Sequence, residues 1–208
     1  MTALGNWSVP RMWEGRTVAV LASGPSMSQS IADDILLSEL PTVVVNTTFR
    51  LAPWADVLYA ADQGWWLRYA KELTEFKGLR VSCTPASPRI GAHLLTNTGK
   101  VGFDPDPSCI RTGGNSGYAA LHLAVHAGAA RILLCGFNMS GEGHWHGRHP
   151  DPLRNAGTGI YARWLLHFQG LAVALKERNV EVLNCTPGSA LTMWPHVSLE
   201  EALEALPA

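Results

Sequence analysis

Short apolar runs rich in valine, isoleucine and leucine alternate along this chain with segments whose apolar residues recur at helical spacing. Each run has the length of one strand, and a run without polar alternation is typical of a strand buried on both faces. Strands that alternate with helices predict a mostly parallel sheet with helices packed on both faces. The predicted strands are Thr17–Ala22, Thr42–Asn46, Asp56–Ala61, Leu79–Cys83, Arg131–Cys135 and Val180–Asn184.

The predicted helices follow these strands. Ser28 or Ser30 is placed to cap the first helix, and Pro41 closes it. The proline- and glycine-rich stretch Thr84–Ile110 predicts loops with a small hairpin. We therefore expect one α/β domain spanning residues 1–208, with a peripheral segment at 1–15. The predicted helices are residues 28–40, Gly64–Phe76, Asn115–Ala127, Ile160–Arg178 and Ser198–Leu206.

Composition narrows the classes of partner. The 208 residues include 16 Lys and Arg against 17 Asp and Glu, a formal net charge of −1, so no basic excess indicates binding to nucleic acid or anionic membranes. No apolar run has the length of a membrane span, and the chain lacks the pattern of a secretory signal. We expect a cytoplasmic protein, either a monomer or a homo-oligomer. Its cysteines, expected to be reduced and without metal-binding spacing, are Cys83, Cys109, Cys135 and Cys185.

Parallel sheets bind ligands at the carboxyl ends of their strands, near the point where the strand order reverses. Polar and glycine residues that directly follow the predicted strands are therefore candidate contacts to a nucleotide donor. They are Ser23, Gly24, Pro25, Ser26, Asn46, Asp62, Gly136 and Asn138.

The turn Ser23–Ser26 has the composition of an anion-binding turn, because glycine permits close backbone approach and the next helix offers free N–H groups. It matches neither GxGxxG nor GxxxxGK[ST]. A tight turn without a ligand is the alternative. The strand-end residues Asn46 and Asp62 need polar partners, either a ribose or sugar hydroxyl or a backbone amide, and Asp62 is also a candidate for holding Mg²⁺ against phosphates.

A second glycine-rich turn leads into the helix after residue 115. Its hydroxyl and amide side chains are able to bond a phosphate, a ribose or a base edge. The alternative is an ordinary helix start, capped by Thr112 or Ser116. The candidate donor contacts in this turn are Thr112, Gly114, Asn115, Ser116 and Gly117.

The long polar loop at residues 136–159 is the predicted active-site loop. It holds His144, His146 and His149, and imidazole titrates near neutral pH, so one of them is a candidate general base for an acceptor hydroxyl. Arg148 is a candidate for holding phosphate. The spacing His-x-His-x-x-His also offers nitrogen ligands to a metal, although it matches no closed zinc site. An exposed loop without function is the remaining alternative.

Several of these motifs occur in the order found in a known family. The chain resembles the bacterial sialyltransferases of glycosyltransferase family 42, and equally the uncharacterised and phage-encoded proteins related to the 6-hydroxymethylpterin diphosphokinase MptE. The likeness spans about Val18 to Leu206. It is carried by Val18–Met27, the strand ending at Asn46, the Ser116-Gly117 turn, Ile132–Gly136, the histidine loop and Asn184–Leu191.

The resemblance implies a Rossmann-like fold in which the Gly24–Ser26 turn, Asn46 and the Ser116-Gly117 turn hold the donor nucleotide. It makes His149 the first candidate base and His146 the second. The sialyltransferases use lid tyrosines to bond the departing phosphate. Here the tyrosine nearest to the loop is Tyr161, and Arg148 is the candidate substitute.

Three functions are therefore weighed. The first is a sugar transferase that takes a nucleotide-activated donor and a hydroxyl acceptor and requires no cofactor. The second is an MptE-like pyrophosphokinase that uses ATP and Mg²⁺, with Asp62 near the metal. The third is a nucleotide-binding module without catalysis.

Overall fold

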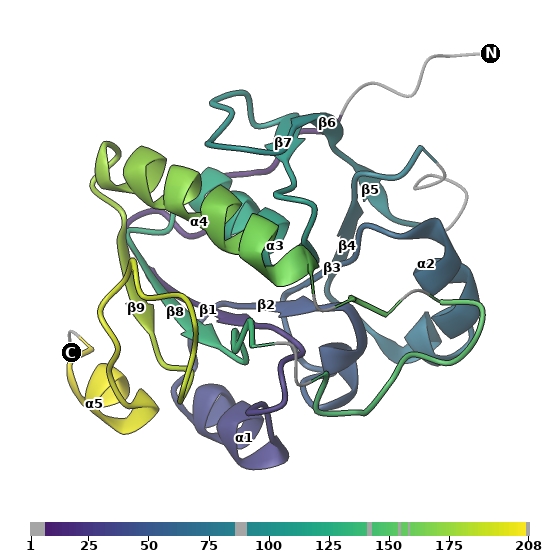
Figure 1. Cartoon of the computed structure of the whole chain (residues 1–208), viewed down its shortest axis with the longest axis horizontal. Helices are drawn as coiled ribbons and strands as arrows, with labels where there is room; N and C mark the ends of the chain where they lie inside the picture. Colours follow the sequence, from purple (N-terminus) through teal and green to yellow (C-terminus); the bar gives the residue numbers. More distant parts are fainter. Residues whose placement is uncertain (1–6, 86–90, 141–142, 154, 158, 207–208) are drawn as a thin grey trace.

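A computed structural model describes residues 7–85, 91–140, 143–153, 155–157 and 159–206 as one α/β domain (Figure 1). Its central sheet has seven strands, all parallel, in the order β5-β4-β3-β2-β1-β8-β9. The predicted parallel sheet is confirmed. The strands are β1 Thr17–Leu21, β2 Thr42–Val45, β3 Val57–Tyr59, β4 Leu79–Ser82, β5 His93–Leu94, β8 Arg131–Cys135 and β9 Glu181–Asn184.

The strand order reverses at β1. From β1 the chain first builds β2, β3, β4 and β5 on one side and later adds β8 and β9 on the other side. Val20 of β1 pairs with Val43 of β2 and with Leu134 of β8, so β1 is the central strand on which both halves meet. The crevice at the carboxyl ends of β1 and β8 is therefore where a fold of this kind binds its ligand.

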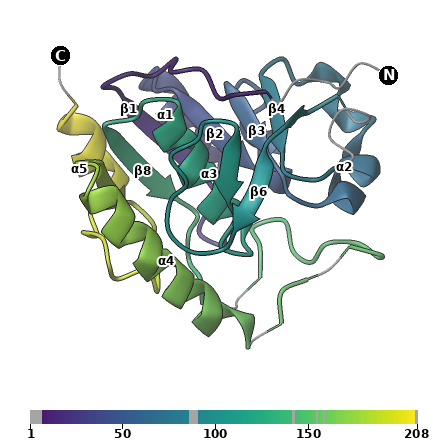
Figure 2. The same cartoon turned by 90° about the horizontal axis from the view of Figure 1, so that it is seen from above.

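Alternate residues of each strand enter two separate cores. Val18 and Val20 of β1 pack toward α3 (Ser116–His126) and α4 (Ile160–Lys176). Ala19 and Leu21 pack toward the helices of the opposite face. Figure 2 shows α3 and α4 lying together on one side of the sheet. The helices of the second face are α1 Gln29–Leu37, α2 Gln63–Tyr69 and α5 Leu199–Glu204.

Helix starts follow local capping chemistry. The Ser28 side chain accepts a hydrogen bond from the Ile31 N–H at α1, and Ser198 forms a reciprocal capping box with Glu201 at α5. At α3 the cap is Asn115, so the two caps considered from the sequence, Thr112 and Ser116, were wrong. Two 3₁₀ helices complete the described elements, η1 Asn46–Arg50 and η2 Glu72–Glu75.

The stretch between β4 and α3 differs most from its prediction. The expected hairpin is instead the parallel pair β6 (Thr96–Gly99) and β7 (Cys109–Arg111), and β5 joins the edge of the main sheet. The expected helix Gly64–Phe76 stops at Tyr69 and continues as η2. Residues 86–90 of the predicted loop, 1–6 of the predicted peripheral segment and 141–142, 154 and 158 of the predicted active-site loop lie outside the described residues.

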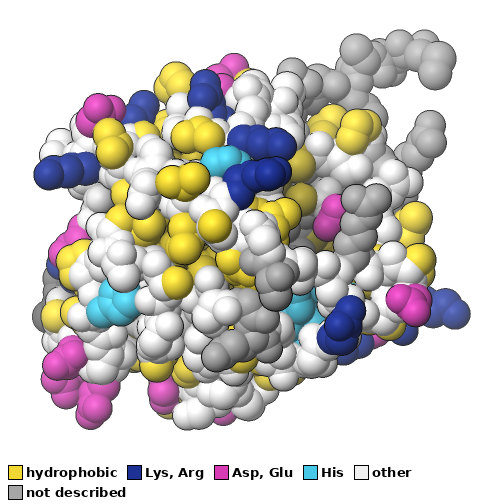
Figure 3. Space-filling view, in the orientation of Figure 1, with side chains coloured by type: hydrophobic (Ala, Val, Ile, Leu, Met, Phe, Trp, Pro, Cys, Tyr) yellow, Lys and Arg dark blue, Asp and Glu magenta, His cyan; other side chains and the backbone are white. Residues whose placement is uncertain are grey.

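The helices and cysteines bear on what the sequence predicts for membrane spans and thiols. Among the described residues, no helix combines the length and the apolar character of a membrane span. Two apolar side chains of α4 itself are nevertheless exposed, Leu166 at 64% and Val173 at 61%. Figure 3 shows apolar side chains on this face of the molecule. The cysteines are free thiols, of which Cys135 and Cys185 are buried.

Candidate functional site

A cavity of about 320 Å³ lies at the reversal point of the sheet. It is lined by the turns after β1, β2 and β8, by the first residues of α3 and α4, and by the loop before α4. Its size falls in the range of small-molecule sites. The predicted residues that line it are Ser23, Gly24, Pro25, Asn46, Asp62, Gly114, Asn115, Ser116, Gly117, Gly136, Asn138 and His149.

Four predicted residues do not line this cavity. Ser26 donates from its N–H and hydroxyl to the Asn138 Oδ1, so it supports a lining residue. Thr112 is buried and accepts a hydrogen bond from the Gly114 N–H. Arg148 is exposed. His146 packs beside His149 and not on the cavity wall.

Several residues that line the cavity were not predicted from the sequence. The first turn of α4 contributes Ile160, Tyr161 and Trp164, and the Tyr161 and Trp164 rings meet edge to face at 5.1 Å. Their helical spacing showed that they share a face, but not that this face meets the cavity. The other unpredicted residues are Ala22, Val45, Met139, Ser140, Gly143, Asn155, Ala156 and Gly157, whereas His144, a candidate base in the predicted loop, also lines the cavity.

Glycines 24 and 136 allow two turns to touch. The Gly24 N–H donates to the Gly136 carbonyl at 2.8 Å, and a Cβ on Gly24 would clash with that carbonyl oxygen and with the Asn138 Oδ1. Gly136 has φ +76°, and its own Cβ would lie 2.7 Å from the Ala22 carbonyl oxygen. The glycines are therefore required by backbone packing, whether or not a ligand is bound.

Asn138 is held by the segment that follows β9. Its Oδ1 accepts from Ser26, and its Nδ2 is 3.4 Å from the Pro187 carbonyl oxygen. The Thr186 hydroxyl accepts from the Phe137 N–H, and the Ser189 hydroxyl donates to the Phe137 carbonyl. The segment after β9, through Thr186, Pro187 and Ser189, therefore stabilises the turn after β8. Asn138 forms part of the cavity wall and is held by contacts within the protein.

The N-terminus of α3 faces the cavity. Asn115 accepts from the N–H groups of Gly117 and Tyr118 at 2.8 Å and 3.2 Å. The Ser116 N–H, at the first helical position, has no partner inside the helix. α4 also begins at the cavity, with Ile160, but the Ile160 N–H already donates to the Gly157 carbonyl at 3.1 Å. The start of a helix attracts anions through its partial positive charge and its free N–H groups.

Asn46 occupies a special backbone position between β2 and η1. Its φ is +50°, a left-handed conformation that asparagine tolerates better than most residues. Among the described residues its side chain has no hydrogen bond, and it lines the cavity. Ser23 fixes the neighbouring strand ends by donating to the Val45 carbonyl at 3.0 Å and contacting the Thr48 hydroxyl at 2.9 Å.

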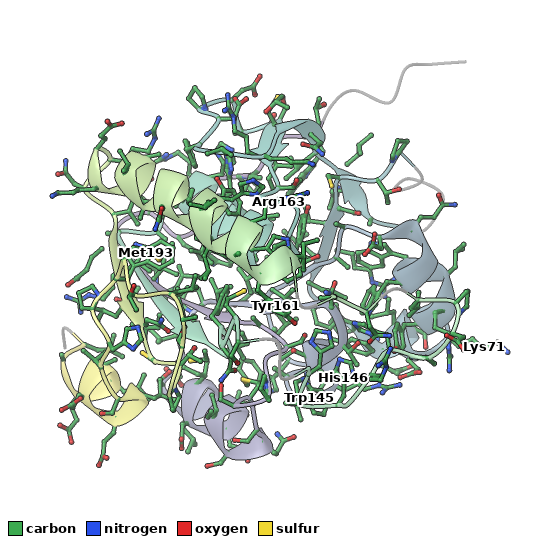
Figure 4. All side chains as sticks on the ribbon, viewed as in Figure 1. Lys71, Trp145, His146, Tyr161, Arg163 and Met193 are labelled. Carbon is green, nitrogen blue, oxygen red and sulfur yellow. The ribbon has the colours of Figure 1, made fainter. Side chains whose placement is uncertain are left out.

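The histidine loop is attached to the turn after β1. The Trp145 N–H and the His144 Nδ1–H both donate to the Ser23 carbonyl at 3.2 Å, and the Trp145 indole donates to Thr48. Figure 4 shows Trp145 and His146 together on this loop, with Tyr161 above them at the start of α4. These contacts bring the loop against the cavity.

Three imidazoles of this loop form one cluster. The ring centroids of His144, His146 and His149 are 4.8–5.0 Å apart. Burial, and after it the neighbouring imidazoles, lowers the pKa of His146 to about 4, and burial and the His144 ring lower the pKa of His149 to about 4. Both rings are therefore neutral at pH 7 and have a free lone pair.

A smaller cavity of about 210 Å³ adjoins the first. Asn46, Asp62 and His149 line both cavities. Its remaining walls are mainly apolar: Gly64, Trp65, Pro152 and Leu153. A molecule in either cavity would thus reach His149.

The site contains few charges. No lysine or arginine among the described residues lines either cavity, so an anion there depends on backbone N–H groups. In the part of the chain that the structure describes, no three His, Cys, Asp or Glu side chains are arranged to hold a metal ion. The predicted alternative of a metal bound by His144, His146 and His149 has no support in this arrangement.

Comparisons with known proteins give no relative. No protein-family model matches the chain, and neither a curated protein nor a solved structure matches it.

Proposed function

We propose that this protein transfers a sugar from a nucleotide-activated donor to an acceptor hydroxyl, with His149 as the general base. The observation that carries the proposal is that His149 lines both cavities, together with Asn46 and Asp62. The larger cavity suits the donor, because it lies at the reversal point of the sheet and receives the start of α3. The smaller cavity suits the acceptor.

In the proposed reaction, His149 takes the proton of the acceptor hydroxyl at Nε2. The acceptor oxygen attacks the anomeric carbon, and the bond from that carbon to the phosphate oxygen breaks with its electron pair on the phosphate. A single in-line displacement inverts the anomeric carbon. The lowered pKa keeps the His149 ring unprotonated at pH 7, which a general base requires.

The departing phosphate would be stabilised by α3 and by Tyr161. The free N–H at Ser116 offers a hydrogen bond, and the helix end offers partial positive charge. Tyr161 lines the cavity, and burial raises its pKa, so its hydroxyl stays protonated and able to donate. Tyr161 replaces Arg148 in this role because Arg148 is exposed and absent from the cavity lining.

The absence of cationic side chains from the described lining favours a lightly charged donor. A nucleoside triphosphate carries several negative charges, which two helix ends neutralise poorly without a metal. A nucleotide that carries one or two phosphates suits the site better. This charge argument favours the sugar transferase over the pyrophosphokinase.

One observation nevertheless favours the pyrophosphokinase as second candidate. Asp62 is the N-cap residue of α2, but its side chain makes no capping hydrogen bond, and the residue lines both cavities, so its carboxylate is available for Mg²⁺. In that reaction ATP and Mg²⁺ would occupy the larger cavity.

Ligand screening followed by one substitution tests the proposal. Nucleotides and nucleotide sugars, with and without Mg²⁺, are screened by thermal shift, where a ligand at 100 times its Kd stabilises by about 2.7 kcal/mol. The donor found is then assayed with sugar acceptors. His149→Ala should reduce kcat by about 10²–10⁴-fold and leave the nucleotide Kd nearly unchanged. Tight nucleotide binding without transfer to any acceptor would favour the non-catalytic binding module.

A further inference from the structure

Two buried imidazole nitrogens in the histidine cluster lack hydrogen-bond partners. They are the Nε2 of His146 and the Nδ1 of His149, and the described residues supply neither with a donor or acceptor. Buried polar atoms are nearly always paired, so two unpaired atoms on neighbouring rings require an explanation. The ring centroids are 4.8 Å apart, with an interplanar angle of 49°.

The buried Nδ1 of His149 indicates which ring nitrogen faces the cavities. Because His149 lines both cavities and its Nδ1 is buried, Nε2 is the nitrogen left to face them. A neutral histidine that accepts a proton at Nε2 must carry its own hydrogen on Nδ1. Catalytic bases of this kind are commonly oriented by an acceptor behind Nδ1–H. Here no described carboxylate or carbonyl bonds that atom.

We propose that His146 is a positioning residue for His149, with the His146 Nε2 lone pair accepting a hydrogen bond from the His149 Nδ1–H. This inference rests on the proposed function, because His146 would be the orienting group that the proposed base His149 requires. The bond pairs both unpaired nitrogens at once. A separation of 4.8 Å between ring centres permits it after small rotations of the rings.

Neighbouring contacts hold His146 in place for this role. Its ring stacks on His144 with centroids 5.0 Å apart at 17°, and His144 is itself fixed by the Ser23 carbonyl. The Trp145 ring meets His146 edge to face. The backbone of His149 is separately held by Asn155, so the proposed bond fixes the one remaining freedom, the rotation of the ring.

Two matched substitutions separate hydrogen bonding from packing. His146→Gln retains an acceptor at similar reach, whereas His146→Leu fills similar space without one. His93→Leu, at the sheet edge against Trp7, is the control for loss of a histidine elsewhere. Thermal denaturation shows whether each variant folds.

The direct measurement is the tautomer of His149, read from ring ¹⁵N shifts of the histidine-labelled protein at pH 7. We expect the Nδ1–H form in the wild type, in His93→Leu and in His146→Gln, and a mixture of tautomers in His146→Leu. With the donor identified, kcat should fall about 10–100-fold in His146→Leu and recover in His146→Gln, while the nucleotide Kd stays constant.

Several results would overturn the inference. One is a His149 ring that carries its hydrogen on Nε2 in the wild type, and another is an unchanged tautomer in a folded His146→Leu. A third is Zn²⁺ titration that shifts the signals of all three loop histidines at one equivalent, because the unpaired nitrogens would then be metal ligands. The tautomer measurement needs no substrate, so failure of the proposed transfer reaction would be seen separately, as absence of turnover.

Discussion

The side chain of Asn155 hydrogen-bonds both backbone polar groups of His149. Its Oδ1 accepts from the His149 N–H at 2.7 Å, and its Nδ2 donates to the His149 carbonyl at 3.1 Å. A single amide therefore fixes the backbone of the proposed base inside a loop that has no helix or strand in its described part.

Asn155→Ala should therefore impair transfer more than folding. Loss of the two hydrogen bonds is expected to cost about 1–2 kcal/mol of unfolding free energy, measured by urea denaturation. We expect kcat to fall about tenfold or more because His149 loses its fixed position. Asn155→Asp keeps the hydrogen-bond acceptor and loses the donor, so its kcat should lie between that of the wild type and that of Asn155→Ala. Equal activity in all three proteins would contradict the role of this contact.

Gly24→Ala should destabilise the protein strongly. Its methyl group would overlap the Gly136 carbonyl oxygen and the Asn138 side chain, so the turns after β1 and β8 must separate. We expect a loss of about 2–4 kcal/mol of unfolding free energy and weaker nucleotide binding. Gly159→Ala is the matched control, because a Cβ there meets no atom within 4 Å and φ is −73°. Equal stability of the two variants would show that the close approach is not required.

Stability should decrease with falling pH below about 6.5. Burial, followed by the nearby His126, lowers the pKa of His122 to about 3, and its ring accepts from the Arg111 N–H and bonds the Asp104 carbonyl as a neutral group. A folded-state pKa below the unfolded value means that the unfolded chain binds the proton first. The free energy of unfolding should therefore fall by about 1.4 kcal/mol per pH unit for this one group, between pH 6.5 and 3.

Urea denaturation at pH 7.5, 6.5, 5.5 and 4.5 measures this dependence. His122→Gln should be less stable than the wild type at pH 7.5. Its free energy of unfolding should also fall less steeply with pH, by about 1.4 kcal/mol per pH unit, because one titrating group is lost. The lowered pKa values of His144, His146 and His149 add to the slope in both proteins. A wild-type stability that stays constant from pH 7.5 to 4.5 would contradict the neutral burial of these rings.

Asp62→Asn should separate the two enzymatic hypotheses. For a metal-free sugar transferase, removal of a negative charge that faces the cavities should leave or strengthen nucleotide binding. For a pyrophosphokinase, loss of this carboxylate should weaken Mg²⁺-dependent ATP binding. Calorimetric titrations of both proteins, with Mg²⁺ and with EDTA, distinguish these outcomes.

The sequence was informative where structure is local. The apolar runs predicted the strands from β1 to β4, β8 and β9, because a strand buried on both faces needs an unbroken apolar segment. The sequence did not indicate β5 or the parallel pairing of β6 with β7. The β6 sequence Thr-Asn-Thr-Gly is largely exposed and has no apolar signal. The loop between Thr96 and its partner Cys109 is short for a parallel connection, so it favoured the prediction of an antiparallel hairpin.

The candidate site was predictable only in part, for the same reason. Residues that directly follow strands, such as Gly24 and Asn46, converge because parallel strands end at one edge of the sheet. Tyr161 reaches the cavity only through the packing angle of α4, which no local pattern encodes. The contact between Asn155 and His149 lies within an irregular loop, where no periodicity links the two positions.

The most direct test of the account is a crystal structure of the protein with a nucleotide identified by the thermal-shift screen. The account predicts the phosphate within hydrogen-bond distance of the Ser116 N–H at the start of α3. It predicts the sugar-bearing end directed toward Asn46 and His149, with the smaller cavity open beyond it. A nucleotide bound elsewhere on the molecule, or bound in this cavity with its transferable group directed away from His149, would contradict it.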